Sequence, residues 1–409
     1  MKEGSAGAGD TPSAKRARDW FVISEIALTL TLLVAAGLIL KSFSRLQSLS
    51  LGYEPRALFT ARFELPWKKY NDRDKIGIFA KALLDKVRAL PGVQSAGVSS
   101  NGPLMGGWQT GFWREENPRP QPADMLNSDL EVVSGDYFST LKVPLLRGRT
   151  FNERDTKDSP RVIVIDQAMA EQYFPGEDPI GKRLGVDIGN DGESYVMSEI
   201  IGVVPRMRFH AVDEMAPLPV IYASLSQAQR TSLTLFVRST TAPAALEHSI
   251  RNAVTSIDSS LAVFDARPMT DRVHETWGAQ RLLSFLFSIF AALALLLATI
   301  GLYGLLAYTT LKRVREIGIR LALGARPAQI RALVLSHGLQ LLLIGSAIGL
   351  LGTIAISRAL RSVLFETSSL DPRIYLGVGV VLFTATLLAS WLPARRAARV
   401  DPIIALRYE

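Results

Sequence analysis

Four apolar segments constrain this chain more than any other feature of its sequence. They cover residues 20–40, 282–310, 332–356 and 374–392, and each is close to the about 20 helical residues needed to cross a bilayer. The chain is 48% hydrophobic with a positive mean hydropathy, yet 21% of its residues are charged. This mixture predicts an α-helical membrane protein with four transmembrane helices and a substantial water-soluble part.

The first apolar segment has the basic residues of a secretory signal in front of it, namely Lys15, Arg16 and Arg18. Its about 20 apolar residues exceed the 7–15 of a signal-peptide core, and no clear A-x-A cleavage site follows. We therefore expect it to remain in the protein as a membrane anchor.

Positive charge is concentrated in three short segments, residues 1–19, 311–331 and 393–409. They hold 14 of the 46 Lys and Arg residues but only six of the 38 Asp and Glu residues, so the rest of the chain is balanced at 32 of each. The positive-inside rule places all three segments in the cytoplasm, with both termini inside and residues 41–281 outside. The loop at 357–373, which carries three arginines, departs mildly from this rule. Charge thus reports topology and argues against nucleic-acid binding.

Residues 41–281 are too long to be a connecting loop and predict an α+β extracytoplasmic domain inserted between the first two membrane helices. The Gly/Pro-rich residues 102–122 and residues 185–194 are expected to be loops or an insertion between subdomains. Residues 269–280 are expected to be a stalk helix that runs into the second membrane helix. Residues 1–19 are expected to form a disordered cytoplasmic tail. Strands are predicted at residues 57–65, 93–100, 129–133, 161–166, 200–204, 220–223 and 233–238, and helices at 72–90, 167–174 and 243–258.

The segment KRVREIGIRLALGARP, residues 312–327, predicts a short basic amphipathic helix on the cytoplasmic side. Helical spacing puts Arg313, Glu316 and Arg320 on one face, and Glu316 and Arg320 form a favourable i, i+4 pair. Gly324 is placed to end the helix and Pro327 to begin the next one. From these residues alone, a charged loop lying on anionic lipid is an equally good interpretation.

This segment resembles the coupling segment of the FtsX-like permease domain, which docks into a partner ATPase. The ending PARRAARVDPIIALRYE, from residue 393, is similar to the C-terminal signature of the same domain. VVSGDYFSTLKVPLLRGRTFNERD from residue 132 and VIDQAMAEQYFPGEDPIGKRL from residue 164 resemble the MacB-type periplasmic core domain. The resemblance implies coupling residues at Arg313, Arg315, Glu316, Ile317, Gly318, Arg320 and Gly324.

The resemblance implies a bacterial inner-membrane ABC permease without a substrate tunnel. ATP-driven motion of a separate cytoplasmic ATPase would be transmitted to the periplasmic domain, for efflux or extraction of a substrate. The sequence resembles MacB without its fused ATPase, or the second half of duplicated permeases. We therefore expect a homodimer or pairing with a second permease, together with a periplasmic adaptor or partner protein. The alternative is a non-transporting scaffold whose outer domain regulates a partner such as a cell-wall hydrolase.

Other sequence features carry weaker hypotheses. Glu25 lies inside the first membrane segment and is a candidate polar site, best explained by the membrane interface or an interhelical hydrogen bond. Gly345, Gly349 and Gly352 form a small-residue stripe that suits packing within the chain or a dimer contact equally well. Residues 176–183, GEDPIGKR, nearly match a P-loop but lack its hydroxyl residue. No metal or cofactor site is predicted, and an anchored enzyme is disfavoured.

Overall fold

The computed structural model divides the chain into two compact units, Met1–Ser48 with Ala279–Glu409, called here the helical unit, and Leu49–Gly278, called here the outer domain. The residues that the structure describes are 12–188, 195–211, 217–228, 230–359 and 370–399.

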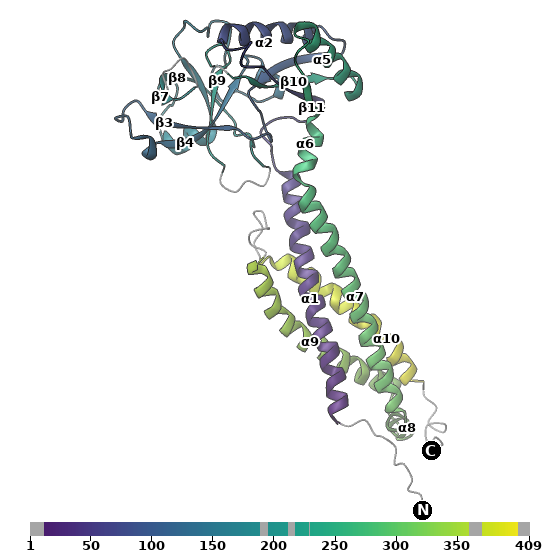
Figure 1. Cartoon of the computed structure of the whole chain (residues 1–409). Coiled ribbons are helices and arrows are strands. Elements are labelled where there is room, and N and C mark those ends of the chain that lie inside the picture. Colours follow the sequence, from purple (N-terminus) through teal and green to yellow (C-terminus); the bar gives the residue numbers. More distant parts are fainter. Residues whose placement is uncertain (1–11, 189–194, 212–216, 229, 360–369, 400–409) are drawn as a thin grey trace, which may run out of the picture. The chain divides into compact units, whose positions relative to one another are not determined.

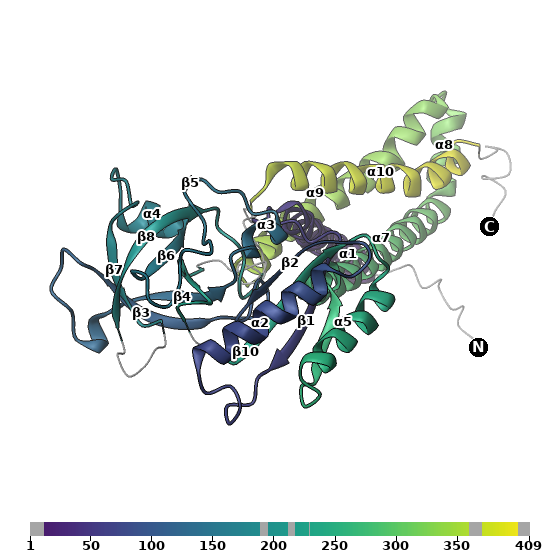
Figure 2. The same cartoon turned by 90° about the horizontal axis from the view of Figure 1, so that it is seen from above.

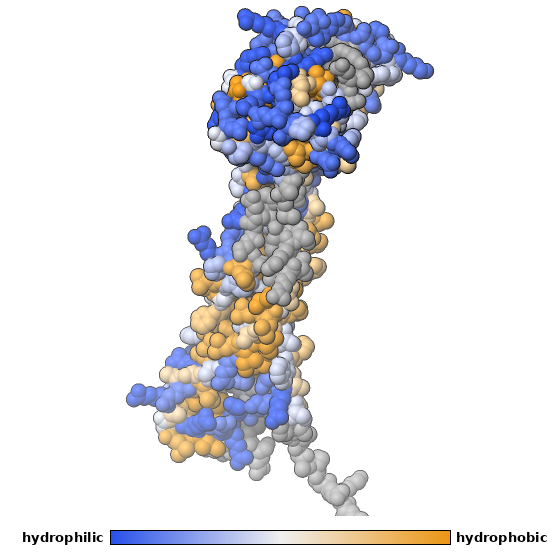
Figure 3. Space-filling model, turned by 90° about the vertical axis from the view of Figure 1, so that its left-hand side faces the viewer, coloured by the Kyte–Doolittle hydropathy of each residue, from blue (hydrophilic) through white to orange (hydrophobic). Residues whose placement is uncertain are grey.

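The helical unit contains long apolar helices and one short helix (Figure 1). Among the described residues, four helices are long and apolar enough to cross a membrane, and the outer domain lies between the first and second of them. A band of apolar surface covers the middle of this unit in Figure 3. The helices are α1 (Pro12–Ser48), α7 (Gly278–Lys312), α8 (Val314–Ala322), α9 (Pro327–Ala359) and α10 (Pro372–Ala397).

α1 is the central helix of this unit, since 67% of its apolar stretch is buried against 17–28% for the other three. It begins at Pro12, so residues 12–19 are helical although a disordered tail was expected there; lysine, arginine and alanine favour helix. Three terminal or loop segments lie outside the described residues. They are residues 1–11, residues 360–369 of the expected 357–373 loop, and residues 400–409 of the expected C-terminal tail.

The outer domain is built on one extended sheet with two parts (Figure 2). In the first part the strands run in the order β11–β1–β10–β2, all antiparallel. The second part is a closed circuit, β4–β3–β7–β8–β6–β9 and back to β4, joined to the first where Ser99 pairs with Val133. The strands are β1 (Leu58–Glu64), β2 (Val93–Ser99), β3 (Trp108–Arg114), β4 (Leu126–Val133), β5 (Arg147–Gly148), β6 (Val162–Asp166), β7 (Arg183–Val186), β8 (Val196–Val204), β9 (Val220–Ser224), β10 (Ser232–Ser239) and β11 (Val263–Pro268).

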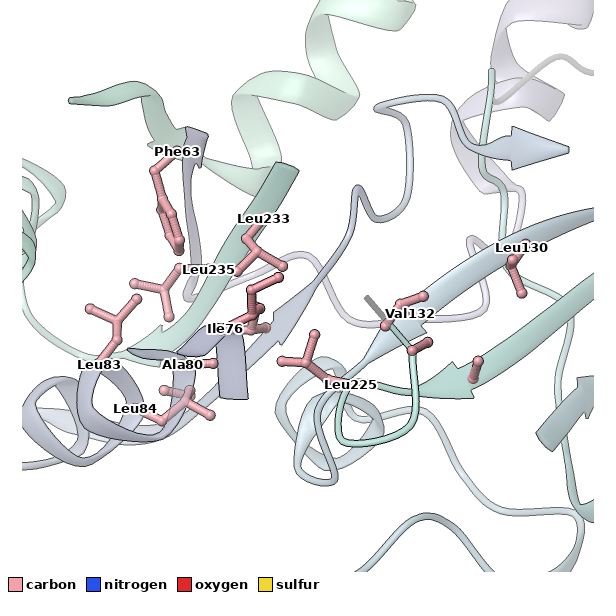
Figure 4. Packing of buried hydrophobic residues seen from close by; sticks show 14 of the residues in the cluster. Phe63, Ile76, Ala80, Leu83, Leu84, Leu130, Val132, Leu225, Leu233 and Leu235 are labelled. Atoms are coloured by element: carbon pink, nitrogen blue, oxygen red, sulfur yellow. The ribbon is translucent and has the colours of Figure 1, made fainter. Parts of the chain in front are cut away.

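Helices α2 (Arg73–Arg88) and α5 (Pro243–Ile257) pack with the first part of the sheet. Alternate residues of β1 and β10, including Phe63 and Leu235, point toward the apolar face of α2, where Leu83 is completely buried (Figure 4). Full burial of such side chains contributes about 1.5–3 kcal/mol each. The shorter helices are α3 (Tyr137–Leu141), α4 (Gln167–Tyr173) and α6 (Met269–Thr276), with a 3-10 turn at Pro122–Asp124.

Three expectations about residues 102–280 were wrong. Residues 102–122 are not all loop, because β3 lies among them and pairs with β4 on one side and β7 on the other. Residues 185–194 include the end of β7, and 189–194 lie outside the described residues. The stalk is not one continuous helix with the second membrane helix either: α6 ends at Thr276, and Trp277 forms a turn before α7 starts at Gly278.

Two buried arginines form hydrogen bonds that hold the first and last segments of the outer domain against its sheet. Arg238 of β10 donates to the carbonyl oxygens of Glu54, Arg56 and Thr140 at 2.7–2.8 Å. Arg272 of α6 donates from Nε to the Thr60 hydroxyl at 2.8 Å, from Nη1 to the Asp265 carboxylate at 2.7 Å and from Nη2 to the Asp265 carbonyl at 2.6 Å. Arg238 thus holds the segment that leads into β1, and Arg272 holds the helix that follows β11.

Asp166 gives the outer domain a pH-dependent stability. Its carboxylate caps α4 by accepting from the Met169 backbone N–H at 2.8 Å, and burial raises its pKa to about 6. A carboxyl whose pKa is higher in the folded state stabilises that state below the unfolded pKa of about 3.9, and this stability is lost as pH rises through 6.

We expect the free energy of unfolding to fall by about 1 kcal/mol between pH 5 and pH 7 because of this group. Urea unfolding of the full-length protein at both pH values, for wild type and Asp166→Asn, measures the change. The variant should lack this part of the pH dependence; identical pH profiles for the two proteins would show that the carboxyl is not perturbed.

Candidate functional site: the α8 segment

The α8 segment divides its residues sharply between a buried and an exposed face. Ile317 is 1% exposed and Gly318 is also buried, and Leu321 packs against the same apolar cluster of the helical unit. Residues on the opposite side, at helical spacing from one another, are exposed. These are Arg315, Glu316, Ile319, Arg320 and Leu323. The buried stripe fixes which way the exposed face points.

The exposed face carries charge and apolar surface together. Glu316 accepts from Arg320 Nη2 at 2.6 Å, with both side chains about half exposed, so this i, i+4 pair organises the surface but adds little stability. Ile319 and Leu323 follow Arg315 at intervals of four, and Leu323 is 83% exposed. Apolar side chains beside ordered charges are typical of surfaces that bind another protein.

Both ends of α8 are set by local sequence. After Ala322, Gly324 takes φ +92°, and the N–H groups of Gly324 and Ala325 donate to the carbonyls of Leu321 and Arg320 at 3.0 and 2.9 Å. A residue with a β-carbon is strained at this φ, which is why glycine suits this turn. Pro327 then begins α9, and the Gln329 side chain accepts from the Arg326 N–H at 2.9 Å, half of a capping box.

At its other end α8 is separated from α7 by Arg313 alone. The Arg313 N–H donates to the carbonyls of Thr309 and Thr310 at 3.2 and 3.1 Å, continuing the last turn of α7, while its side chain is exposed. The sequence predicted Arg313 on the same helical face as Glu316 and Arg320, whereas in the structure Arg313 precedes α8. The sequence analysis did not identify Ile319 and Leu323, although their i, i+4 spacing places them together on the exposed face.

The glycine stripe of α9 lies against α1 of the same chain. A β-carbon on Gly345 would come within 2.8 Å of Ile26, and one on Gly349 within 2.8 Å of the Ala27 carbonyl oxygen. Gly352 faces Thr31, whose hydroxyl donates to the carbonyls of Ala27 and Gly349 at 2.8 and 3.2 Å. Close backbone approach between α1 and α9 therefore depends on this stripe.

Glu25 of α1 lies beside α7. A β-carbon on Gly301 would lie 2.3 Å from Glu25 Oε2. The absence of a side chain at Gly301 therefore leaves room for the carboxylate. Within the described part of the chain this oxygen is buried without a hydrogen-bond partner. One turn further along α1, the Thr29 hydroxyl donates to the Ala294 carbonyl of α7 at 3.1 Å. The hydrogen bond from α1 to α7 in this region thus comes from Thr29.

The three large aromatic residues of β3 differ in exposure. Phe112 is completely buried and Trp113 nearly so, whereas Trp108 is 59% exposed. The segment GEDPIGKR is preceded by α4 and not by the strand that a P-loop requires.

Two family models match this chain. The MacB-like periplasmic core domain matches residues 26–253, more than half of the chain, and the FtsX-like permease C-terminal domain matches residues 288–402, which include α8.

Relatives named macrolide export ATP-binding/permease protein MacB align with about two thirds of this chain. The protein of Wolinella succinogenes is 28% identical over 293 residues, covering 69% of this chain and 44% of its own length. Those of Escherichia coli K12 and Acinetobacter baylyi are 27% and 26% identical, covering 68% of this chain and 43% and 42% of their own lengths. The chain thus spans less than half the length of these relatives.

Solved structures similar to this chain include the periplasmic region of MacB from Actinobacillus actinomycetemcomitans, with a TM-score of 0.35 and 16% identity over 52% of this chain and 90% of that one. The extracellular domain of the noncanonic ABC-type transporter YknZ from Gram-positive bacteria has a TM-score of 0.33 and 15% identity, over 51% of this chain and 100% of that one. The two family matches, together with the four apolar helices, establish that the chain belongs to the MacB/FtsX family of multi-pass inner-membrane ABC permeases.

Proposed function

We propose that this permease receives ATP-driven motion from a separate ABC ATPase at α8 and transmits it to the outer domain, to move a substrate out of the periplasm or the outer leaflet. The observation that carries the proposal is the exposed face of α8, where the Glu316–Arg320 pair lies beside Ile319 and Leu323. A partner would bury the two apolar side chains and contact the charged pair around them.

The orientation of the chain is part of this proposal. The positively charged segments at residues 1–19, 311–331 and 393–409 lie in the cytoplasm, which puts α8 on the side where ATP is hydrolysed and the outer domain in the periplasm. Because the chain has no cysteine, single introduced cysteines can report the side of each segment by their labelling with a membrane-impermeant reagent.

Rigid attachment at both ends of α8 supports transmission rather than simple docking. Ile317 is anchored in the apolar cluster of the helical unit, Arg313 continues α7, and the Gly324 turn leads directly into α9. A displacement of α8 would therefore reach two membrane helices, because little flexible chain is available to absorb it.

The test is co-purification of an ATPase with the tagged protein from native membranes. Exchanging the charged pair, Glu316→Arg with Arg320→Glu, keeps an opposite-charge i, i+4 pair on the helix but reverses the charge presented to a partner. We expect recovery of the ATPase to fall at least tenfold, since facing like charges cost several kcal/mol at an interface.

The matched control exchanges Glu247 and Arg251, an i, i+4 pair of similar exposure on α5 of the outer domain. It should leave recovery of the ATPase unchanged. Equal recovery with the exchanged α8 pair would place the contact elsewhere, and a wild-type preparation that yields a periplasmic enzyme without any ATPase would favour the scaffold function.

A further inference from the structure

We infer that the helical unit holds an anionic phospholipid by its headgroup, in a pocket between the first turns of α1 and the last turns of α7. The pocket has a volume of 310 Å³ and is lined mainly by four cations, Lys15, Arg18, Lys312 and Arg313, and by the apolar surfaces of Leu305 and Tyr308. We call this feature the basic pocket.

Electrostatics in the basic pocket favour a bound anion. Arg18 lies over the Tyr308 ring with its guanidinium carbon 4.5 Å from the ring centre, and Lys312 Nζ is 5.5 Å from the same centre. Two cations thus share one aromatic ring, and no carboxylate of the described residues lines the pocket. Asp19, the next residue after Arg18, is 3.8 Å from His337 Nε2 and is not a lining residue. A phosphate group would relieve the mutual repulsion of Lys15, Lys312 and Arg313, which line the same pocket.

The surroundings favour a lipid as the source of that phosphate. Trp20 and Phe21 follow directly on α1 and are 59% and 67% exposed, and exposed aromatic residues at the end of an apolar helix mark the membrane–water interface. The basic pocket therefore lies at headgroup level, with apolar helix surface beyond it for the acyl chains. Basic pockets between transmembrane helices are suited to anionic lipid headgroups.

The pocket also adjoins the α8 segment, because Arg313 lines it and lies between α7 and α8. A bound headgroup would hold Arg313 and fix the angle at which α8 leaves the membrane. This inference relies on the proposed orientation only to name the cytoplasmic leaflet as the source of the lipid.

The experiment is lipid titration of the purified full-length protein in detergent, followed by native mass spectrometry, with phosphatidylglycerol and phosphatidylcholine as probes. The variant Lys15→Gln with Arg18→Gln and Lys312→Gln removes three pocket cations and leaves Arg313 in place. Each cation is expected to contribute about fivefold to the affinity for the lipid, so the variant should bind its first phosphatidylglycerol molecule about 100-fold more weakly. Binding of phosphatidylcholine should be unaffected.

The matched control, Arg16→Gln with Arg395→Gln and Arg399→Gln, removes three exposed cations that do not line the pocket. It should weaken the first phosphatidylglycerol less than fivefold. An equal loss in both variants would reduce the effect to diffuse surface charge and overturn the site. Displacement of the lipid by millimolar glycerol 3-phosphate would overturn the lipid as the source.

If the triple variant does not fold, Lys15→Glu replaces it in the experiment, because Lys15 is exposed and its substitution should not disturb folding. Normal phosphatidylglycerol binding by Lys15→Glu would contradict the proposal. The measurement needs no ATPase and no defined membrane side. A wild-type protein that co-purifies no ATPase but still binds phosphatidylglycerol at the basic pocket would therefore refute the proposed function and leave this site standing.

Discussion

Replacing Arg238 with methionine is expected to destabilise the outer domain by about 4 kcal/mol, because it leaves the buried carbonyl of Thr140 and the partly buried carbonyls of Glu54 and Arg56 without their charged donor. Methionine nearly fills the volume of the aliphatic part of arginine, so the loss comes from hydrogen bonding more than from packing. The guanidinium itself costs free energy to bury, which offsets part of this loss and keeps the net effect below the sum of three bonds.

Pulse proteolysis of the full-length protein across a urea series measures this change, since cleavage reports the unfolded fraction. Arg154→Met, at an exposed position of the same domain, is the control and should stay within about 0.5 kcal/mol of wild type. Arg238→Lys should fall between the two, because one ammonium group cannot reach three separated carbonyls. A methionine variant as stable as the control would mean that water satisfies these carbonyls.

Gly349→Val is expected to destabilise the helical unit by about 3 kcal/mol, the upper range for overpacking. The first added carbon would lie 2.8 Å from the Ala27 carbonyl oxygen and 3.1 Å from the Ala27 α-carbon, both backbone atoms that cannot rotate away. α9 would have to move off α1, which would also break the Thr31 to Gly349 hydrogen bond.

Gly377→Val on α10 is the matched control, since a β-carbon there meets no atom within 4 Å. Unfolding by titration with sodium dodecyl sulfate in mixed micelles compares the two variants with wild type. A Gly349→Val protein that keeps its stability but loses a dimer would contradict packing of the stripe within the chain and favour the intermolecular contact.

Much of the architecture could be predicted because its signals are local. Apolar length indicates membrane helices, and Gly324 and Pro327 mark the limits of α8 and α9 because a positive φ and a missing N–H are properties of single residues. The helix expected at 72–90 is α2, which the Asp72 side chain caps by accepting from the Asp74 N–H at 3.0 Å.

What was missed depends on partners distant in sequence. β3 is a strand because β4 and β7 pair with its two edges, although its own glycine-containing sequence suggests a loop. The burial of Arg238 requires carbonyls from residues more than 90 positions away. The spacing of Leu323 could have placed it on the charged face of α8, but its exposure there depends on the packing of Ile317 into the helical unit.

The two arginine anchors have a mechanical consequence. The chain enters the outer domain just before β1 and leaves it just after β11, and these strands are antiparallel neighbours, so both connections join the same end of one strand pair. A pull shared equally by both connections loads β1 and β11 in the same direction and shears no hydrogen bond between them. A pull on one connection alone slides β1 along β11 and strains the Arg272 contacts to Thr60 and Asp265. The β1–β11 edge of the sheet is thus undisturbed when both connections move together, and it is strained when one connection moves relative to the other.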